Sequence, residues 1–417
     1  MKYRRFLSLS ITAILMTSGG GVFAASFEEY VERLSSHPQV ETLLTKSEAT
    51  KSQAQGALGL PDPMLMIGVD NLPVSDPEFD RFLPTSKVIG FNQKIPNPVL
   101  LRAKSDKLEQ LSEKQKLMAD YTRARLQYML IAKMAEYKSA KTRRGLINKQ
   151  LKFYKELEDT FQGQIESGRA VYQRFSEVDV ERAEAERKLN DINAQIASIE
   201  AVFIRLIDEV PQIDIPKIVD ASWDSNADAI YPVLISSQDI NIAQKATKIA
   251  DAAFLPNFGV NAIYKQREDG QNNSFSGEDW FSVQAQITVP LWASKNQKPK
   301  LKAAQDSQRS AEFAYDDMVR QWKAQMEAIR AMRDSAALNV KVLQDKDHAM
   351  EHKVRASQRN YEAGTEGLSR VLLARIDRLN IQAQLAQLKA IHLSKAAEFN
   401  SNIVDGFTVA VSDTTKE

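Results

Sequence analysis

The sequence contains one pentapeptide with a known metal-binding order, His348-Ala349-Met350-Glu351-His352, which matches the H-x-x-E-H pattern of certain zinc peptidases. Histidines four residues apart share a helix face and reach one metal ion together. A zinc peptidase also needs a third ligand and a pocket, whereas this pentapeptide lies within a long amphipathic segment. We interpret His348 and His352 as surface residues of a helix that make at most a weak metal contact.

Other reactive groups are scarce. The chain has no cysteine, which excludes thiolate catalysis, cysteine-ligated metals and disulfides. The phosphate-binding G-x-x-x-x-G-K-[ST], the dinucleotide-binding G-x-G-x-x-G and the hydrolase G-x-S-x-G patterns are missing from the sequence. The 55 Lys and Arg balance 54 Asp and Glu, so no field of one sign favours nucleic acid. We predict a protein that is not an enzyme and binds no cofactor, structural metal or nucleic acid.

Residues 1–24 have the composition of a secretory signal peptide. Lys2, Arg4 and Arg5 precede an apolar run, and small residues follow, with cleavage expected after about Ala24. The apolar run is too short to span a membrane as a helix, and no later stretch reaches the roughly 18 apolar residues that a spanning helix needs. We expect an exported protein without a transmembrane helix.

The chain repeats one pattern at a spacing of about 195 residues. Matching landmarks in the two halves are Pro38 and Pro232, Leu60-Pro61 and Leu255-Pro256, Ile95-Pro96 and Val289-Pro290, and Ser167-Gly168 and Ala363-Gly364. Landmarks of four kinds in one register indicate an internal duplication.

Each half begins with a helix-length segment, about Phe27 to Ala57 and about Ala227 to Ala253, and continues with two strands. The strands at about 257–265 and 281–289 alternate apolar and polar residues, which is the pattern of a half-buried strand. The strands at about 64–69 and 88–95 are less regular. The stretches between paired strands are polar and are expected to be loops.

Long helices are expected after each strand pair. No proline occurs between Pro98 and Pro211 or after Pro299, and a helix of roughly 60 residues would be about 95 Å long. Apolar residues step by three and four, as in a coiled coil. One stripe comprises Tyr315, Met318, Trp322, Ile329, Met332, Ala336, Val340 and Leu343, and the stripe of the returning helix comprises Leu368, Leu372, Ile376, Leu379, Ala383, Ala386, Ala390, Leu393 and Ala397.

The strands are long enough to cross a bilayer, with one apolar and one polar face. Four strands cannot close a barrel, and lipid does not tolerate an open edge, so three chains with twelve strands are expected. A small soluble antiparallel sheet is the alternative. Met64 and Met66 would share one strand face, where thioethers suit copper, but we expect them to meet lipid or a neighbour.

The sequence resembles the TolC family of outer-membrane efflux proteins over nearly the whole mature chain. The resemblance rests on the duplicated order of elements, the "LPDP" and "FLPN" strand entries, the "VQAQITVPLW" strand end and "NYEAGTEGLSRVLLARIDRLNIQAQL" at 360–385. "GLPDPMLMIGVDNLP" and "VIGFNQKIPNPVLLRAK" further resemble the heavy-metal branch of the family.

The resemblance implies an α+β membrane protein: a homotrimer with a 12-stranded outer-membrane β-barrel, four strands per chain, continued by a long periplasmic α-helical barrel. The expected divisions are a signal peptide (1–24), a first repeat (25–210, strands within 62–95), an equatorial linker (211–226), a second repeat (227–403, strands within 256–290) and a C-terminal tail (404–417). The implied partners are outer-membrane lipid, a periplasmic adaptor (membrane fusion protein) and an inner-membrane pump of the resistance-nodulation-division type.

Some members of the family narrow at the periplasmic tip through acidic residues shortly after a turn glycine. Counted from Gly364, those positions fall on Arg370 and Leu373, so an acidic gate cannot be carried over from this half. We expect adaptor docking at the tips around Gly168 and Gly364, and an aperture drawn from five charged residues: Arg174, Glu177, Asp179, Arg370 and Asp377.

Two interpretations of these charges stay open. They form an Arg-carboxylate network that holds the resting aperture shut, or they merely solvate helix surfaces. The expected function is passive conduction across the outer membrane in a tripartite efflux system, with heavy-metal ions or small toxic compounds as cargo. The alternatives are a protein or peptide export duct of the same fold and a periplasmic coiled-coil scaffold without a pore.

Overall fold

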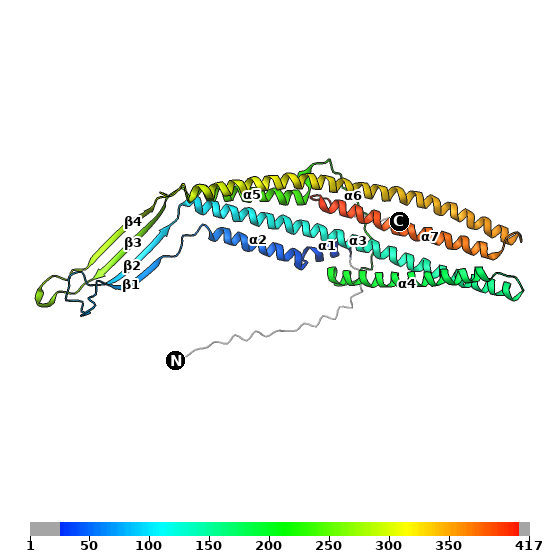
Figure 1. Cartoon of the computed structure of the whole chain (residues 1–417), viewed down its shortest axis with the longest axis horizontal. Coiled ribbons are helices and arrows are strands. Elements are labelled where there is room, and N and C mark those ends of the chain that lie inside the picture. Colours follow the sequence, from blue (N-terminus) through cyan, green and yellow to red (C-terminus); the bar gives the residue numbers. More distant parts are fainter. Residues whose placement is uncertain (1–25, 408–417) are drawn as a thin grey trace, which may run out of the picture.

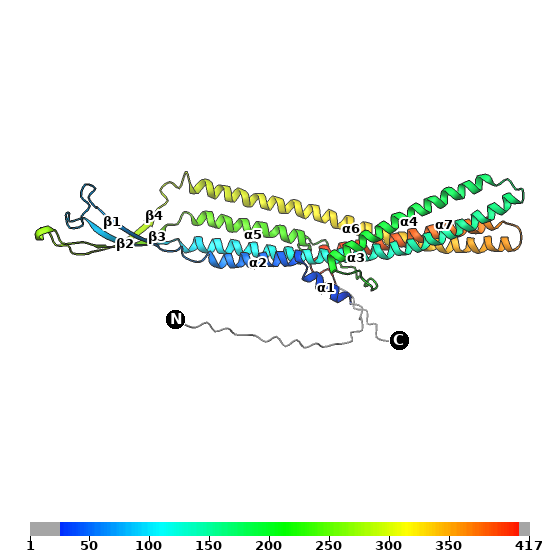
Figure 2. The ribbon, with the colours of Figure 1, turned by 90° about the horizontal axis from the view of Figure 1, so that it is seen from below.

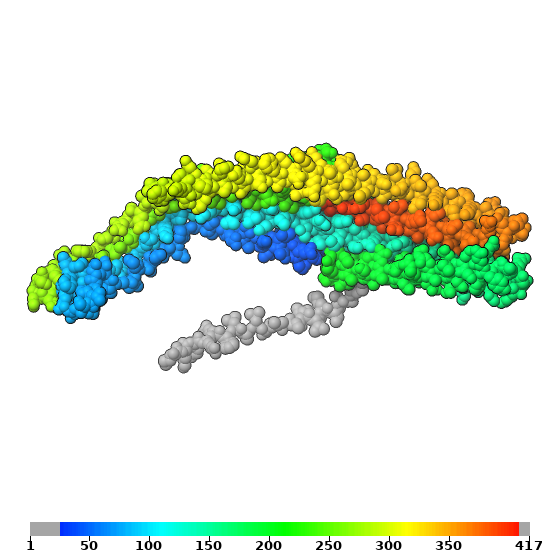
Figure 3. Space-filling view, viewed as in Figure 1, coloured from blue at the N-terminus to red at the C-terminus, as the bar shows by residue number. Residues whose placement is uncertain are grey.

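The structure is a computed structural model that describes residues 26–407. The predicted signal peptide, and residues 408–417 of the predicted tail, lie outside the described residues. The chain extends along one axis, with a sheet at one end and helices along the remaining length (Figure 1). The space-filling view shows the same slender, slightly curved body (Figure 3).

Both halves of the chain contain the same order of elements. After α1 (Phe27–Ser35), the first half has α2 (Pro38–Gly56), β1 (Met64–Asp70), β2 (Ser86–Ile95), α3 (Pro98–Glu166) and α4 (Tyr172–Ile207). The second half, preceded by a short 3-10 turn at Ala227–Ala229, has α5 (Tyr231–Ala252), β3 (Asn257–Gln266), β4 (Trp280–Thr288), α6 (Gln297–Glu362) and α7 (Leu368–Asn402). The duplication expected from the sequence is therefore present in the fold.

The first helical segment differs from the prediction. A single helix was expected from about Phe27 to Ala57, but the chain breaks between α1 and α2. His37 has an extended conformation (φ −62°, ψ 140°) because the ring of Pro38 disfavours a helical residue before it. Pro38 then begins α2, where its missing N–H costs nothing.

The four strands form one antiparallel sheet in the order β1-β2-β3-β4. The two halves of the chain join through β2 and β3, where Phe91 is opposite Ala262 and Ile89 is opposite Tyr264. β1 and β4 are the two edge strands. Along each of them, one row of backbone N–H and C=O groups has no partner strand within the described chain.

The two longest helices run nearly the whole length of the helical part. α3 has 69 residues and α6 has 66, so each is about 100 Å long. α5 lies between them near the sheet and α7 lies between them farther away, while α2 and α4 lie on the outer side of α3 (Figure 1). Among the described residues, no helix combines the length and the apolar composition needed to cross a membrane.

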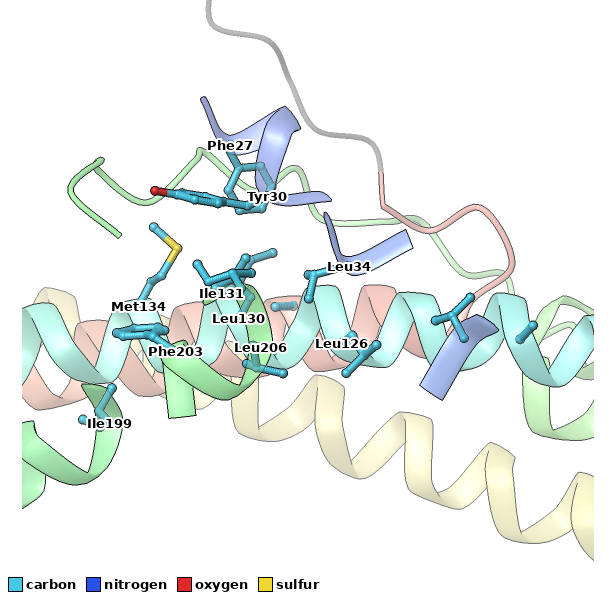
Figure 4. Close-up of a cluster of buried hydrophobic side chains, with 14 residues drawn as sticks. Phe27, Tyr30, Leu34, Leu126, Leu130, Ile131, Met134, Ile199, Phe203 and Leu206 are labelled. Carbon is cyan, nitrogen blue, oxygen red and sulfur yellow. The ribbon is translucent and has the colours of Figure 1, made fainter. Parts of the chain in front are cut away.

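A second layer covers the middle of the helices on one side. Residues 210–218, which we call the strap, follow α4 and pack together with α1 on α3 (Figure 2). Phe27, Tyr30 and Leu34 of α1 are buried against Leu130 of α3 and Phe203 of α4 (Figure 4). This cluster fixes the position of both α1 and the strap.

The expected stripe on α6 is correct except at one position. Ile329 and Ala336 are buried, but Met332 is 55% exposed. Arg333 lies inward instead: its guanidinium is 5.0 Å from the ring centroid of Phe399 and 3.6 Å from Asp220. In a heptad pattern, inward residues are spaced alternately by four and three. Position 333 lies four residues after Ile329 and three before Ala336, so it faces α7. A charged residue at an inward position cannot be inferred from apolar spacing.

The returning helix gives a direct test of this packing. Ile376 of α7 is 4% exposed and lies in one cluster with Leu157 and Leu372. We expect Ile376→Ala to cost about 2 to 5 kcal/mol, because the removed side chain leaves a cavity. The thermal unfolding temperature of the purified protein, followed by circular dichroism, should fall clearly for this variant. Gln384→Ala, which changes an exposed residue of α7, is the control, and equal temperatures for both variants would contradict the assignment.

Candidate functional site

The far end of the helical part consists of two helix turns, each closed by a glycine in the left-handed region. Gly168 has φ +83° and Gly364 has φ +73°. Behind each, an amide bonds back into the last turn of the helix: Arg169 N–H donates to Gln164 O, and Thr365 N–H donates to Asn360 O, both at 2.9 Å. A methyl group added at either glycine would meet no atom within 4 Å. The backbone angle, not crowding, therefore requires glycine at both turns.

The five charged residues predicted for the aperture lie near these tips, and all five are exposed. Glu177 accepts a hydrogen bond from Gln173 at 3.0 Å. Asp179 is 3.8 Å from Arg182, and Asp377 is 3.6 Å from Lys353.

Arg174 and Arg370 form no ion pair with a carboxylate of the described chain. Glu177 has its hydrogen bond within α4, and Asp377 pairs with a lysine of α6. One chain therefore does not assemble an Arg-carboxylate network from these residues.

Two other arginines, which the sequence pattern did not single out, bridge the two helices of each hairpin. Arg182 of α4 is 2.5 Å from Glu158 of α3. Arg378 of α7 contacts Asp347 of α6 at 3.0 Å and Glu351 at 2.9 Å. Each arginine lies fourteen residues after its turn glycine. This repeated arginine is the signal in the sequence that would have revealed the pair.

The Arg378 contacts are partly buried, with 27% of its side chain and 18% of that of Asp347 exposed. The hydrogen bond that Arg378 donates to Asp347 and the nearby negative charges raise the pKa of Arg378. The pKa of Glu351 is lowered, chiefly by its hydrogen bond from Arg355 and then by the charges of Arg355 and Arg378. Partial burial makes these charge pairs stronger than fully exposed ones.

The negative charge of Asp377 also affects Tyr154, a buried residue of α3. Tyr154 of α3 is 6% exposed. Burial raises the pKa of Tyr154 to about 12, and the negative charges of Glu181 and Asp377 add to the effect. The phenol therefore stays protonated and neutral, and its O–H lies 3.5 Å from a carboxylate oxygen of Glu181.

His348 and His352 are exposed on α6, as predicted. Glu351, which lies between them, is already engaged by Arg355 and Arg378. The described residues contain no group of three or more His, Cys, Asp or Glu that is placed to hold a metal ion. His348 and His352 therefore flank a glutamate that is paired with two arginines.

The sheet at the other end presents two different faces. Residues paired across the strands place apolar side chains together on one face: Leu65, Ile67, Val69, Ile89, Phe91, Phe258, Val260, Ala262, Tyr264, Phe281, Val283, Ala285 and Ile287. Many are largely open, Ile67 at 84% and Phe281 at 70%. The opposite face carries polar residues, among them Asn92, Asn261, Ser282, Gln284, Gln286 and Thr288.

Met64 and Met66 are on the polar face, not on the apolar one. Met66 is opposite Gly90 in β2, and its methyl group would be 2.9 Å from a Cβ at that position. Met64 and Met66 thus share one strand face, and Met66 contacts a neighbour, as predicted, but this face is the polar one. The irregular pattern of β1 hid this, because its residues on both faces are apolar.

Comparisons with known proteins identify one matching family and several solved structures with the same fold. Residues 235–398 match the family described as "Outer membrane efflux protein". No curated protein sequence matches the chain.

Solved structures with the same fold include the outer membrane protein VceC of Vibrio cholerae (15% identity, TM-score 0.71, covering 91% of this chain and 96% of that one). They also include the CmeC outer membrane channel of Campylobacter jejuni (10%, 0.72, 98% and 96%) and the MtrE outer membrane channel of Neisseria gonorrhoeae (15%, 0.73, 90% and 88%). At these identities the structural likeness establishes the fold.

The arginine between α6 and α7 leads to a prediction on tip stability. In Arg378→Met the aliphatic stem remains but the bond to Asp347 and Glu351 is lost. We expect amide hydrogen exchange near the α6 tip, in residues 345–362, to become about threefold to tenfold faster, as for the loss of a partly buried charged pair of about 1 kcal/mol. Arg355→Met removes a pair within α6 alone and should change exchange less. Equal exchange in both variants would show that Arg378 does not join the helices.

Proposed function

We propose that this protein, as a member of the TolC family of outer membrane efflux proteins, is the outer-membrane channel of a tripartite efflux system. The protein resides in the outer membrane, extends into the periplasm and is not an enzyme. In this proposal it conducts passively, and an inner-membrane pump supplies the energy. The observation that carries the proposal is the continuous apolar face of the sheet, which needs lipid to cover it.

The open edges of the chain favour a trimer. β1 and β4 each need a partner strand, because unpaired backbone groups are not tolerated in lipid. The helical part has matching edges: α6 exposes Phe313, Leu338 and Val342, and α4 on the opposite edge exposes Val180. Three chains that join α6 to the α2 and α4 side of the next would close both parts, giving twelve strands.

The second layer indicates which side of the wall faces outward. α1 and the strap cover one side of α3 only. Inside a closed ring, α1 and the strap would obstruct the duct. On the outside of the ring, they would form a belt around the middle of the helices. In the proposed assembly the opposite side of α3 and α7 therefore lines the duct.

The helix tips supply the contact with the rest of the system. We place docking of a periplasmic adaptor (membrane fusion protein) at the turns around Gly168 and Gly364, since these are the parts farthest from the sheet. The inner-membrane pump is proposed to be of the resistance-nodulation-division type, and the cargo to be heavy-metal ions or small toxic compounds. A scaffold without a pore is disfavoured, because it would leave the apolar sheet face in water.

The trimeric channel is tested by fractionation and crosslinking. The protein should sediment with outer membranes, and amine crosslinking of the purified protein in detergent should saturate at three chains. Deletion of its gene should sensitise the cells to the cargo of the partner pump. A folded monomer released in soluble form by osmotic shock would contradict the proposal.

The aperture is tested by single-channel conductance in planar bilayers. In the trimer, Arg174 and Arg370 would approach one another near the axis, where Glu177 and Asp377 of neighbouring chains would offset their charges. Such exposed pairs are individually weak and screened by salt. We therefore expect Arg370→Ala and Glu177→Ala to raise single-channel conductance about twofold or more. The conductance of the wild type should rise with salt more steeply than the conductivity of the solution does. If Arg187→Ala, a change farther along α4, raises conductance equally, these residues do not form the gate.

A further inference from the structure

An exposed apolar turn lies at the end of the sheet that joins the helices (Figure 1). Leu291 and Trp292 follow β4 and precede α6, and each side chain is 77% exposed. Tryptophan is enriched where the hydrocarbon core of a membrane meets the lipid headgroups. Because the strands cross the outer membrane in the proposed channel, this turn lies at the periplasmic boundary of that membrane.

Basic residues gather next to this turn and at the corresponding end of the first strand pair. Residues 94–105 contain three and residues 289–305 contain four, and neither segment contains Asp or Glu. We call these seven residues the collar, and all are exposed: Lys94, Arg102, Lys104, Lys295, Lys298, Lys300 and Lys302.

The positive charge of the collar is largely uncompensated within the chain. Lys302 pairs with Asp306 at 3.1 Å, whereas the other six collar residues form no ion pair with a carboxylate of residues 26–407. Asp106 lies four residues after Arg102 on α3, but it pairs at 2.7 Å with Lys245 of α5 instead. The collar therefore differs from the many surface charges of this chain that are paired.

The opposite end of the sheet has the reverse charge. Its two loops, residues 71–85 and 267–279, contain seven acidic residues and two arginines. Arg81 pairs with Asp76, and Arg267 is 8% exposed and donates to backbone carbonyls of both loops. An excess of exposed positive charge is thus confined to the end of the sheet that meets the helices.

The height of the collar matches a layer of lipid headgroups. Residues up to Lys302 lie within about 8 Å of the start of α6, and the headgroup layer adds about 5 to 8 Å to each side of the hydrocarbon core. The half-buried Leu301 marks the side of α6 that packs on the chain. Lys300 and Lys302 lie about 100° to either side of Leu301, so in the proposed ring the outer side of the wall carries a lysine.

We propose that the collar binds the phosphate groups of anionic phospholipid in the periplasmic leaflet, while Leu291 and Trp292 contact the adjoining acyl chains. Several Lys or Arg directly beside a membrane-crossing segment attract anionic lipid, and long lysine stems reach the headgroups from the protein surface. The proposal rests on the proposed function, because it requires the strands to lie in the membrane. It adds the class of lipid and the residues that select it.

The test is native mass spectrometry of the purified, full-length protein in detergent. The detergent contains equal amounts of dioleoylphosphatidylglycerol, which is anionic, and dioleoylphosphatidylcholine, which is zwitterionic and has the same acyl chains. We expect the wild type to retain at least about threefold more of the anionic lipid. The combined variant Lys295→Gln, Lys298→Gln and Lys300→Gln should retain the two lipids about equally.

The matched control changes three exposed lysines of α6 that lie farther from the sheet, Lys323→Gln, Lys341→Gln and Lys346→Gln. It removes the same charge and should keep the preference of the wild type. The preference of the wild type should also shrink when ammonium acetate is raised from about 0.1 to 1 M, because salt screens exposed charges. This measurement needs no variant, so it tests the proposal even if a variant fails to assemble.

Trp292→Ala should reduce the retention of both lipids about twofold and leave the preference for the anionic one unchanged. Unreduced retention in this variant would overturn the placement of Trp292 in lipid and favour packing against a neighbouring chain. Absence of a preference in the wild type, or the same preference in the collar variant, would overturn the proposal. A trimer that shows no lipid preference would contradict the collar alone, since crosslinking to three chains tests the channel separately.

Discussion

The unpaired backbone of two edge strands is the constraint on which the rest of the structure depends. The sheet exposes an apolar face. In the proposed channel lipid covers that face, and in lipid the open rows of β1 and β4 would have no water to bond. In the proposed trimer, further copies of the same sheet supply the missing partners in register. The duplicated chain, with a strand pair in each half, would then encode one third of the proposed barrel.

In the proposed assembly, the helices continue the geometry of the barrel below the membrane. Because α3 and α6 follow β2 and β4 in the chain, a ring formed by the strands would also set the spacing of the long helices. α5 and α7 fill the space between them, and the strap with α1 holds the middle from one side. The left-handed turns at Gly168 and Gly364 return the chain toward the belt. Partly buried arginine pairs at Arg182 and Arg378 then join each hairpin near its tip.

Much of this fold could be predicted from the sequence, because period two in the strands and the absence of proline in the long segments are local signals. The turn glycines are predictable for the same reason. Arg333 at an inward position and the face of Met66 are not, since each depends on register against another element. The break before Pro38 follows from a local signal, the effect of the proline ring on His37, which the expected single helix overlooked. The predicted aperture residues reach the tips, but their partners depend on other chains.

The most direct measurement of the central claim is amide hydrogen exchange of the four strands in the protein assembled in lipid. If other copies complete the sheet, the amides of β1 and β4 should exchange as slowly as those of β2 and β3, which are paired within the chain. Fast exchange confined to the outward rows of β1 and β4, with β2 and β3 protected, would show that the edges stay open and would contradict the account.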